Sequence, residues 1–492
     1  MSQPEPVSQP APGAPKHLHS ITAVVGFLVA VEIASGILQG FYTPIWKDIA
    51  HHLSMHDADV NWFEAAQLIV SALAIPLLAR LGDLIGHKRV LLLSTAITAV
   101  GSWILAFAPS FTAFLIGFAI QGAYVVWLPM EVAIVHRRTA ADPRQDRLTR
   151  TAAGVLVFAL EIAVIIGAGL SGALVGGLAM STLLMIPAVA VSIAFFVIWF
   201  GVEDRPGQSG GGVDWTGLGL ITLCLVLVMG GLILIRLNGP GFLVAWLVIV
   251  LGLAAMVPFV RFEAAHDDPI IDVHLFAKPA MWPVQLTAFL FGMSVLGAQI
   301  PLSTFARTDP DKAGFGLGAS AGFVTVLIVV YVVTLAVGAL TLPFTSRLLG
   351  PRGALLAASL LVAIGYALWI PFHDHTWQAL LNMAIAGFGS GALVAALPAS
   401  AAAAAPPERT GFATGMTNGT KTVGGAIASA IFAIALSSTG SLADTKAGHA
   451  PLSGYLTVWA VCSVAALLAA ASLLVVPRGA FADPAEAPLT TP

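Results

Sequence analysis

The sequence predicts an all-α protein that crosses a membrane fourteen times. Of its 492 residues, 58% are hydrophobic and only 10% are charged, whereas about a quarter of a typical soluble protein is charged. Apolar runs of about 18 or more residues recur along the whole chain, which is typical of membrane-spanning helices. Lipid offers backbone groups no hydrogen-bond partners, so each run must form a helix. We therefore expect a polytopic α-helical membrane protein.

The expected spans are separated by short connections. They lie near residues 21–42, 61–81, 90–108, 111–135, 152–177, 181–201, 215–236, 241–260, 281–302, 319–345, 354–371, 377–398, 411–437 and 453–476. A weak internal repeat relates the first six to the last six, because a shift of 264 residues places Gly86 on Gly350 and Lys88 on Arg352. The sequence thus predicts two six-helix bundles with spans seven and eight inserted between them.

Segment boundaries follow from this pattern. We expect, in order, a tail at 1–20, an N-terminal bundle at 21–201, a linker at 202–214, an insert at 215–262, a loop at 263–280, a C-terminal bundle at 281–476 and a tail at 477–492. Both tails are rich in Pro and polar residues, and we expect them to be disordered. The linker reads VEDRPGQSGGGVD, a Gly-rich composition typical of flexible connections.

Basic residues predict how the chain is oriented, because they stay on the cytoplasmic side of a membrane. With the N-terminus inside, sixteen of the 22 Lys and Arg residues lie on the cytoplasmic side, five lie outside, and Lys421 lies within a span. We therefore expect both termini to be cytoplasmic. The net charge of −3 is too small to indicate a nucleic-acid partner.

A charged turn between spans two and three resembles a known family signature. The stretch ARLGDLIGHKR at 79–89 places charged residues and two glycines between apolar runs. It resembles the loop signature of the major facilitator superfamily, and fourteen spans with a central pair resemble its drug:proton antiporter branch. Further stretches resemble that branch in the same order: VDWTGLGLITL (213–223), DDPIIDVHLFAKP (267–279) and GFATGMTNGTKTVGGAIASA (411–430). The resemblance implies the major facilitator fold, with two bundles that rock about a central site.

The resemblance also implies a role for the charged turn. In relatives such a loop is thought to latch the two bundles in one orientation, which makes Asp83, Gly86, Lys88 and Arg89 the latch candidates here. Glycine permits the tight turn, and the aspartate can accept hydrogen bonds from a helix N-terminus or pair with an arginine. The alternative is that the basic residues only orient the protein during insertion.

Two departures from the family pattern bear on proton coupling. Relatives carry an arginine in span four that is credited with assisting proton transfer, and this chain has Phe118 there. The fifth-span signature appears as AGLSGALVGG (168–177), with Ala173 in place of its proline. The signature glycines Gly172, Gly176 and Gly177 are retained, and they allow close helix packing with or without antiport.

Charged groups inside the spans are the main candidates for function. An ionisable group at the bilayer centre costs roughly 3 kcal/mol, so one that persists is a functional candidate by default. Glu32 lies midway along span one, and Ser35 and Gln39 extend a polar stripe on the same helix face. We expect Glu32 to bind a proton or a cationic substrate; the alternative is a structural pairing with a neighbouring helix. Glu161 in span five is the second candidate, and Lys421 is either its partner or a contact for an anionic group.

Other polar residues carry weaker expectations. Glu131 and Glu64 lie near span ends, where we expect them to reach interfacial water. Gln121, Asn382 and Asn418 are candidates for the cavity, although hydrogen bonds between helices explain them equally well. The His-rich loops match no metal-site spacing, and the two cysteines lie inside apolar runs, so we expect no metal, cofactor or disulfide.

These observations predict a secondary transporter of the cell membrane. The resemblance implies export of a small amphipathic or cationic organic compound in exchange for protons, by alternating access, and we expect the protein to act as a monomer in the lipid bilayer. One alternative is a uniporter or metabolite carrier without proton coupling, for which Phe118 and Ala173 are the supporting features. A membrane-embedded enzyme or receptor is the other, but no nucleophile–base constellation is present and no loop is long enough to form a domain.

Overall fold

The structure is a computed structural model that describes residues 24–140, 144–204, 212–266, 269–406, 409–437 and 450–476. Within these ranges the chain is helical, apart from short connections and one isolated bridge between Val175 and Leu178. The two predicted tails and most of the predicted linker lie outside the described residues.

The first bundle consists of six membrane crossings. Their elements are α2 (Leu28–Phe41), η1 (Thr43–Ile45), α3 (Trp46–His52), η2 (Asp57–Val60), α4 (Asn61–Ile85), α5 (His87–Ala106), α6 (Phe111–Gln121), η3 (Gly122–Val126), α7 (Trp127–Arg138), α8 (Gln145–Leu174) and α9 (Met180–Gly201). Spans one and four each combine two helices joined by a 3₁₀ turn. A hydrophobic core that includes Leu28, Val90 and Trp127 lies inside this bundle.

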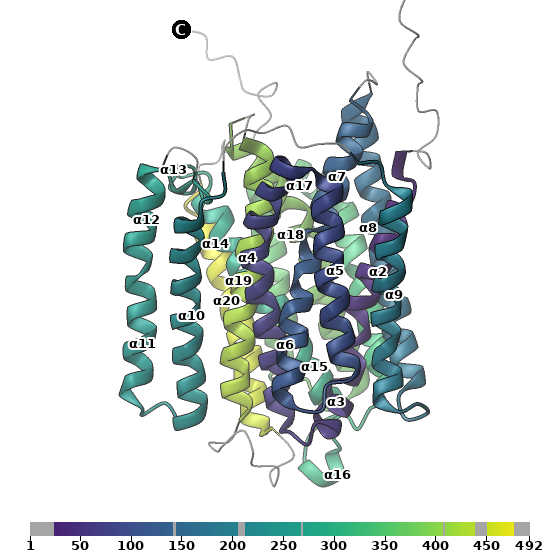
Figure 1. The fold of residues 1–492 in the computed structure, drawn as a ribbon. Helices are drawn as coiled ribbons and strands as arrows, with labels where there is room; N and C mark the ends of the chain where they lie inside the picture. Colours follow the sequence, from purple (N-terminus) through teal and green to yellow (C-terminus); the bar gives the residue numbers. More distant parts are fainter. Residues whose placement is uncertain are drawn as a thin grey trace, which may run out of the picture.

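The insert and the second bundle complete the chain. The insert comprises α10 (Trp215–Asn238), α11 (Leu243–Ala254) and α12 (Met256–Ala265), and the second bundle comprises α13 (Val273–Phe276), α14 (Trp282–Val295), α15 (Gln299–Ala306), α16 (Pro310–Ala313), α17 (Ala321–Leu368), α18 (Thr376–Ala404), α19 (Thr410–Leu436) and α20 (Leu452–Leu473). Figure 1 shows the insert standing beside the bundles, where α10 contacts α4 and α19.

The described helices account for the predicted crossings. Thirteen segments, each a single helix or a run of consecutive helices, are long and apolar enough to span a membrane. One of these, α17, has 48 residues. At about 1.5 Å per residue that is roughly twice the length of one crossing. The backbone of Gly350 has φ 74° inside α17, so the chain turns there and α17 comprises two crossings. The corresponding residue of the first bundle, Gly86, has φ 104° between α4 and α5, and the internal repeat is therefore visible in the backbone.

The insert is fixed to the first bundle by a buried ion pair. Arg236 near the end of α10 donates from Nε and Nη2 to the two carboxylate oxygens of Asp59, each at 3.1 Å. Both side chains are almost completely buried, at 3% and 1% exposed. Such a pair is costly to break because either group alone would be left charged and buried.

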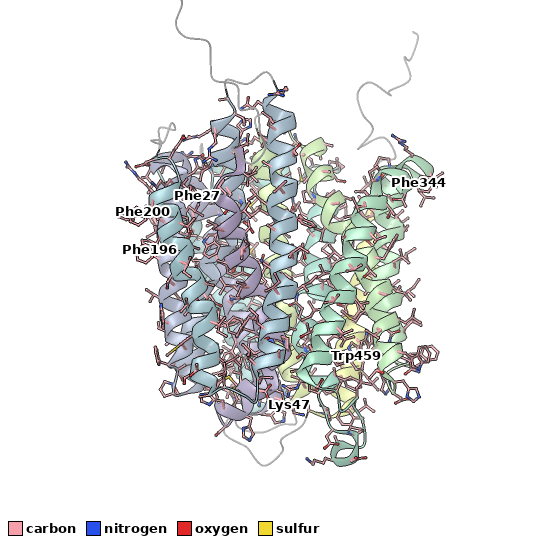
Figure 2. The ribbon with its side chains drawn as sticks, turned by 90° about the vertical axis from the view of Figure 1, so that its right-hand side faces the viewer. Phe27, Lys47, Phe196, Phe200, Phe344 and Trp459 are labelled. Atoms are coloured by element: carbon pink, nitrogen blue, oxygen red, sulfur yellow. The ribbon has the colours of Figure 1, made fainter. Side chains whose placement is uncertain are left out.

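The two bundles meet along two helix pairs and are joined at one end. The helix α4 lies against α19, and α8 lies against α17. We refer to the ends of the molecule as the α13 end and the α16 end, which lie at the top and bottom of Figure 1. At the α16 end Lys47 Nζ donates to the carbonyl of Arg307 at 3.0 Å, and the Arg307 guanidinium pairs with Asp48. This clasp holds the bundles together at the end where Figure 2 labels Lys47.

Candidate functional site

A cavity of about 290 Å³ lies between the two bundles. Its walls come from the first bundle, chiefly α2, α4 and α8, and from α14, α17 and α19 of the second. The polar side chains facing it include Gln39, Glu64, Gln67, Glu161, Gln299 and Lys421. This is where a transporter with two moving halves needs its substrate site, because the walls separate when the bundles rock.

One wall of the cavity is aromatic. The ring of Phe118 lies 5.1 Å from that of Tyr42 and 5.3 Å from that of Trp46, in edge-to-face arrangements, and Tyr42 stacks on Trp46 at 5.9 Å. Phe118 is only 4% exposed and helps to fix this wall. Aromatic faces bind apolar surfaces and cations. Phe118 therefore contributes an aromatic ring to the wall.

Charges of opposite sign face the cavity from opposite bundles. Glu161 belongs to α8, Lys421 belongs to α19, and each acts electrostatically on the other. Among the described residues neither side chain takes part in an ion pair within 4.0 Å or in a hydrogen bond. A second carboxyl, that of Glu64 on α4, also lines the cavity, and its buried Oε2 has no hydrogen-bond partner in the described part of the chain. The prediction that Glu64 reaches interfacial water was wrong, because its side chain faces the cavity between the bundles.

A buried hydrogen-bond network supports the aromatic wall. Gln121 Nε2 donates to the hydroxyl of Tyr42 at 3.0 Å and to Ser102 Oγ at 2.9 Å, and Gln67 Nε2 donates to Gln121 Oε1 at 3.2 Å. Gln121 is completely buried and lies behind the cavity wall. It positions Tyr42 and Gln67, which line the cavity. Gln39 lines the cavity itself and donates to Ser35 at 3.3 Å.

The structure brings Glu32 together with Glu131. Both residues are 0% exposed, and their carboxyl groups lie near enough to act electrostatically on each other. None of the four oxygens accepts a hydrogen bond from an N–H or a hydroxyl group in the described part of the chain. Two carboxylates so close in a dry environment cannot both be ionised, so the pair holds at least one proton. The prediction that Glu131 reaches interfacial water was wrong, because the interior of the first bundle encloses it.

The carboxyl pair lies outside the cavity lining but is not isolated from it. Tyr124 lines the cavity, and both Glu64 and Glu32 act electrostatically on its hydroxyl group. Glu64 and Tyr124 line the cavity, whereas Glu32 and Glu131 are enclosed by the first bundle. The first bundle thus contains two acidic regions, one facing the cavity and one behind it.

Comparison with known proteins identifies the family. A family model described as Major Facilitator Superfamily matches residues 28–309, more than half of the chain, and a second, described as Sugar (and other) transporter, matches residues 283–479. The chain belongs to the major facilitator superfamily. Members of this superfamily are transporters rather than enzymes. The protein is accordingly a multi-pass membrane transporter.

Superfamily relatives with assigned roles differ in what they carry. The chain is 24% identical to a uridine/deoxyuridine transporter of Lactococcus lactis over 62% of its own length and 64% of that relative, which is less than two thirds. It is 27% identical to the cephamycin export protein CmcT of Amycolatopsis lactamdurans over 79% of each chain. It is 24% identical to the multidrug resistance protein Stp of Mycobacterium tuberculosis over 78% of its own length and 70% of the relative.

Solved structures match the fold across most of the chain. A POT family peptide transporter superposes with a TM-score of 0.66 at 16% identity and covers 92% of this chain and 96% of its own. The nucleoside transporter NupG gives 0.62 at 13% identity, covering 93% of this chain and 99% of its own. At these identities the likeness shows the major facilitator fold alone.

The superfamily loop lies at the α13 end of the first bundle. Asp83 Oδ1 lies 3.6 Å from His87 Nε2 across the turn between α4 and α5. Lys88 Nζ donates to the carbonyl of Trp199 at 3.1 Å, and Arg89 pairs with Asp204 at 3.3 Å. Gly86, with its positive φ, forms the turn. These contacts tie α4 and α5 to the end of α9. The latch role itself stays a prediction.

The remaining candidates have local roles in the structure. A Cβ at Gly172 would lie 2.8 Å from Thr325 Oγ1, so this glycine allows α8 to approach α17. Gly176 and Gly177 follow the end of α8, and Gly176 has φ 88° in the turn toward α9. Asn382 donates to the carbonyl of Phe372 at 2.9 Å, and Asn418 is exposed on α19.

Proposed function

We propose that this protein is a secondary active transporter that exports a small amphipathic or cationic organic compound in exchange for protons. The observation that supports this most is the cavity between the bundles, which joins two carboxyl groups, Glu64 and Glu161, to an aromatic wall. Carboxylates attract cations, and aromatic faces bind both cations and apolar groups. Relatives named as a cephamycin export protein and as multidrug resistance proteins favour export of such compounds.

Proton exchange is assigned to the Glu32–Glu131 pair, with Glu161 as a second proton-binding group. A pair of carboxyls that shares a proton can release it when its surroundings change and take it up again from the other side. Alternating access would open the clasp of Lys47, Asp48 and Arg307 and close the opposite end. We place the protein in the cell membrane with both termini cytoplasmic and the α16 end outside, and we assign Asp83, Gly86, Lys88 and Arg89 to a latch at the cytoplasmic end.

Transport into proteoliposomes tests this function. Purified full-length protein is reconstituted, and a panel of fluorescent amphipathic cations, including ethidium, is added with and without an imposed pH gradient. We expect at least one cation to accumulate in proteoliposomes whose interior is more acidic than the medium, because protons that leave the interior drive the cation in. Dissipation of the gradient with a protonophore should stop this accumulation. Accumulation that ignores the gradient would remove proton exchange and leave facilitated transport.

A metabolite carrier without proton coupling is the second candidate. The amide side chains of Gln39, Gln67 and Gln299 could hydrogen-bond a nucleobase beside the aromatic wall. A relative named as a uridine/deoxyuridine transporter and a structural neighbour named as a nucleoside transporter favour this alternative. Exchange of radiolabelled uridine across proteoliposomes without any gradient would support it, and absence of exchange would exclude uridine as cargo.

A further inference from the structure

The cavity carries separated charges of both signs. Its lining residues include two carboxyl groups, those of Glu64 and Glu161, and one amino group, that of Lys421. The carboxyls belong to α4 and α8 of the first bundle, and the amino group belongs to α19 of the second. The tyrosines that face the same space, including Tyr124 and Tyr331, are uncharged in their ordinary form.

The charges on the two bundles do not neutralise each other directly. Glu161 and Lys421 interact electrostatically across the cavity, but they form no ion pair within 4.0 Å in the described part of the chain. Neither has a hydrogen-bond partner among the described residues. A charge held in a partly dry cavity without a close partner is costly, and a ligand that supplies the partner is bound correspondingly tightly.

A ligand with one charge satisfies only one side of this cavity. A simple cation can pair with Glu161 or Glu64 but leaves Lys421 without a partner, and it adds repulsion between like charges. A simple anion pairs with Lys421 and faces the two carboxyls. A molecule that carries an amine and an acidic group satisfies both walls, and its apolar body can lie on the rings of Tyr42, Trp46 and Phe118.

We propose that the cavity selects zwitterionic amphipathic compounds, whose amine binds Glu161 and whose anionic group binds Lys421. This inference rests on the proposed transport function and specifies its substrate class. Because the two charged side chains belong to different bundles, such a ligand bridges the bundles, whereas a singly charged ligand is held mainly by one of them. Glu64 provides a second acceptor for the amine on the same side of the cavity.

Binding of three matched probes tests the proposal. The probes are naphthylalanine, its methyl ester and its N-acetyl derivative, which share one aromatic body but are a zwitterion, a cation and an anion. Dissociation constants are measured by calorimetry on the purified full-length protein in detergent. We expect naphthylalanine to bind at least about tenfold more tightly than either derivative, a difference that corresponds to about 1.4 kcal/mol.

Charge-removing variants then locate the two halves of the site. We expect the zwitterion and the methyl ester to bind equally well to Lys421→Gln, whereas Lys421→Arg should keep the preference for the zwitterion. In Glu161→Gln, the zwitterion and the N-acetyl derivative should have equal dissociation constants. Asp311→Asn and Lys312→Gln are the matched controls, because both residues are exposed on α16 away from the cavity. Both controls should keep the wild-type preference.

The outcomes separate this inference from the transport proposal. The proposal would be overturned if the unmodified protein bound the zwitterion no more tightly than the methyl ester. It would also be overturned if binding of the zwitterion could not be detected. A tenfold preference that survives Lys421→Gln would overturn the assignment of the anion site. Gradient-driven transport of cations is measured independently in proteoliposomes, so a failure there leaves the binding preference intact, and the reverse also holds.

Discussion

The two bundles share a fold but differ in chemistry. The first encloses four carboxyl groups in its spans: Glu32, Glu64, Glu131 and Glu161. In the described part of the second bundle, Lys421 is the one charged side chain away from the ends of the crossings, because Arg347 and Arg352 of α17 flank the turn at Gly350. Yet the backbone repeat is close, since Gly86 and Gly350 take the same kind of left-handed conformation at equivalent turns. The two bundles therefore share a backbone feature, whereas the acidic groups lie in one of them.

The second bundle also has a buried aromatic cluster, but no carboxyl group accompanies it inside the described crossings of that bundle. Trp459 stacks on Trp369 at 5.0 Å and meets Phe305 edge-to-face at 4.8 Å, toward the α16 end, where Figure 2 labels Trp459. These side chains are completely buried. Buried ring contacts make a rigid, uncharged unit. We propose a division of labour, in which the first bundle handles protons and the second provides a stiff wall that holds one counter-charge.

The largest expected effect comes from removing the buried carboxyl pair of the first bundle. Glu32→Gln or Glu131→Gln should abolish pH-gradient-driven export, because an amide cannot release the shared proton, while Lys421→Gln should keep proton coupling and change only substrate preference. Transport in proteoliposomes with and without a gradient is the measurement, and detergent-solubilised size-exclusion profiles check folding. Loss of coupling in the Lys421 variant, with Glu32→Gln still coupled, would reverse the division between the bundles.

A second prediction concerns the aromatic core. Trp459→Ala should lower the stability of the second bundle by about 3–5 kcal/mol, because a large buried side chain is removed from a packed cluster. Thermal unfolding of the detergent-solubilised protein measures this. Trp377→Ala is the matched control, since Trp377 is 59% exposed and should tolerate the change. Equal losses for the two variants would contradict the account of the second bundle as a rigid unit.

The smallest expected effect tests whether the two turns related by the internal repeat are structurally equivalent. Gly86→Ala and Gly350→Ala should each cost about 1 kcal/mol, because only glycine adopts a positive φ without steric cost. The two losses should be similar if the turns are equivalent. Gly154→Ala provides the control, because Gly154 lies in a helix with open space around its Cβ position. A thermal shift in only one of the two turn variants would show that the turns are not equivalent.

The sequence predicted the crossings because a membrane-spanning helix can be recognised from the hydrophobicity of its own residues. Even the 48-residue α17 resolves at Gly350 into two predicted spans. The intramembrane charges Glu161 and Lys421 were found in the same way, and both line the cavity. The signal was simply a charge in an apolar run.

The partnership of groups on different helices could not be predicted. Glu32 and Glu131 are 99 residues apart, and their contact depends on how α2 and α7 are rotated and packed. The burial of Glu131 was not predicted either. It precedes the basic end of α7 by a few residues, yet its side chain is fully enclosed by the first bundle. The apolar stretch on both sides of Glu131 was the one available signal. Phe118 was noticed for the arginine that it replaces, and its role in the aromatic wall needed the positions of Tyr42 and Trp46.

The most direct test of the acidic first bundle is proton release on substrate binding. Purified protein in weakly buffered detergent solution is mixed with a transported cation, and the pH change is followed with a soluble indicator dye. We expect the unmodified protein to release protons and Glu32→Gln and Glu131→Gln to release none, although both variants still bind the cation. Equal proton release by the unmodified protein and both variants would contradict the claim that this carboxyl pair couples protons to transport.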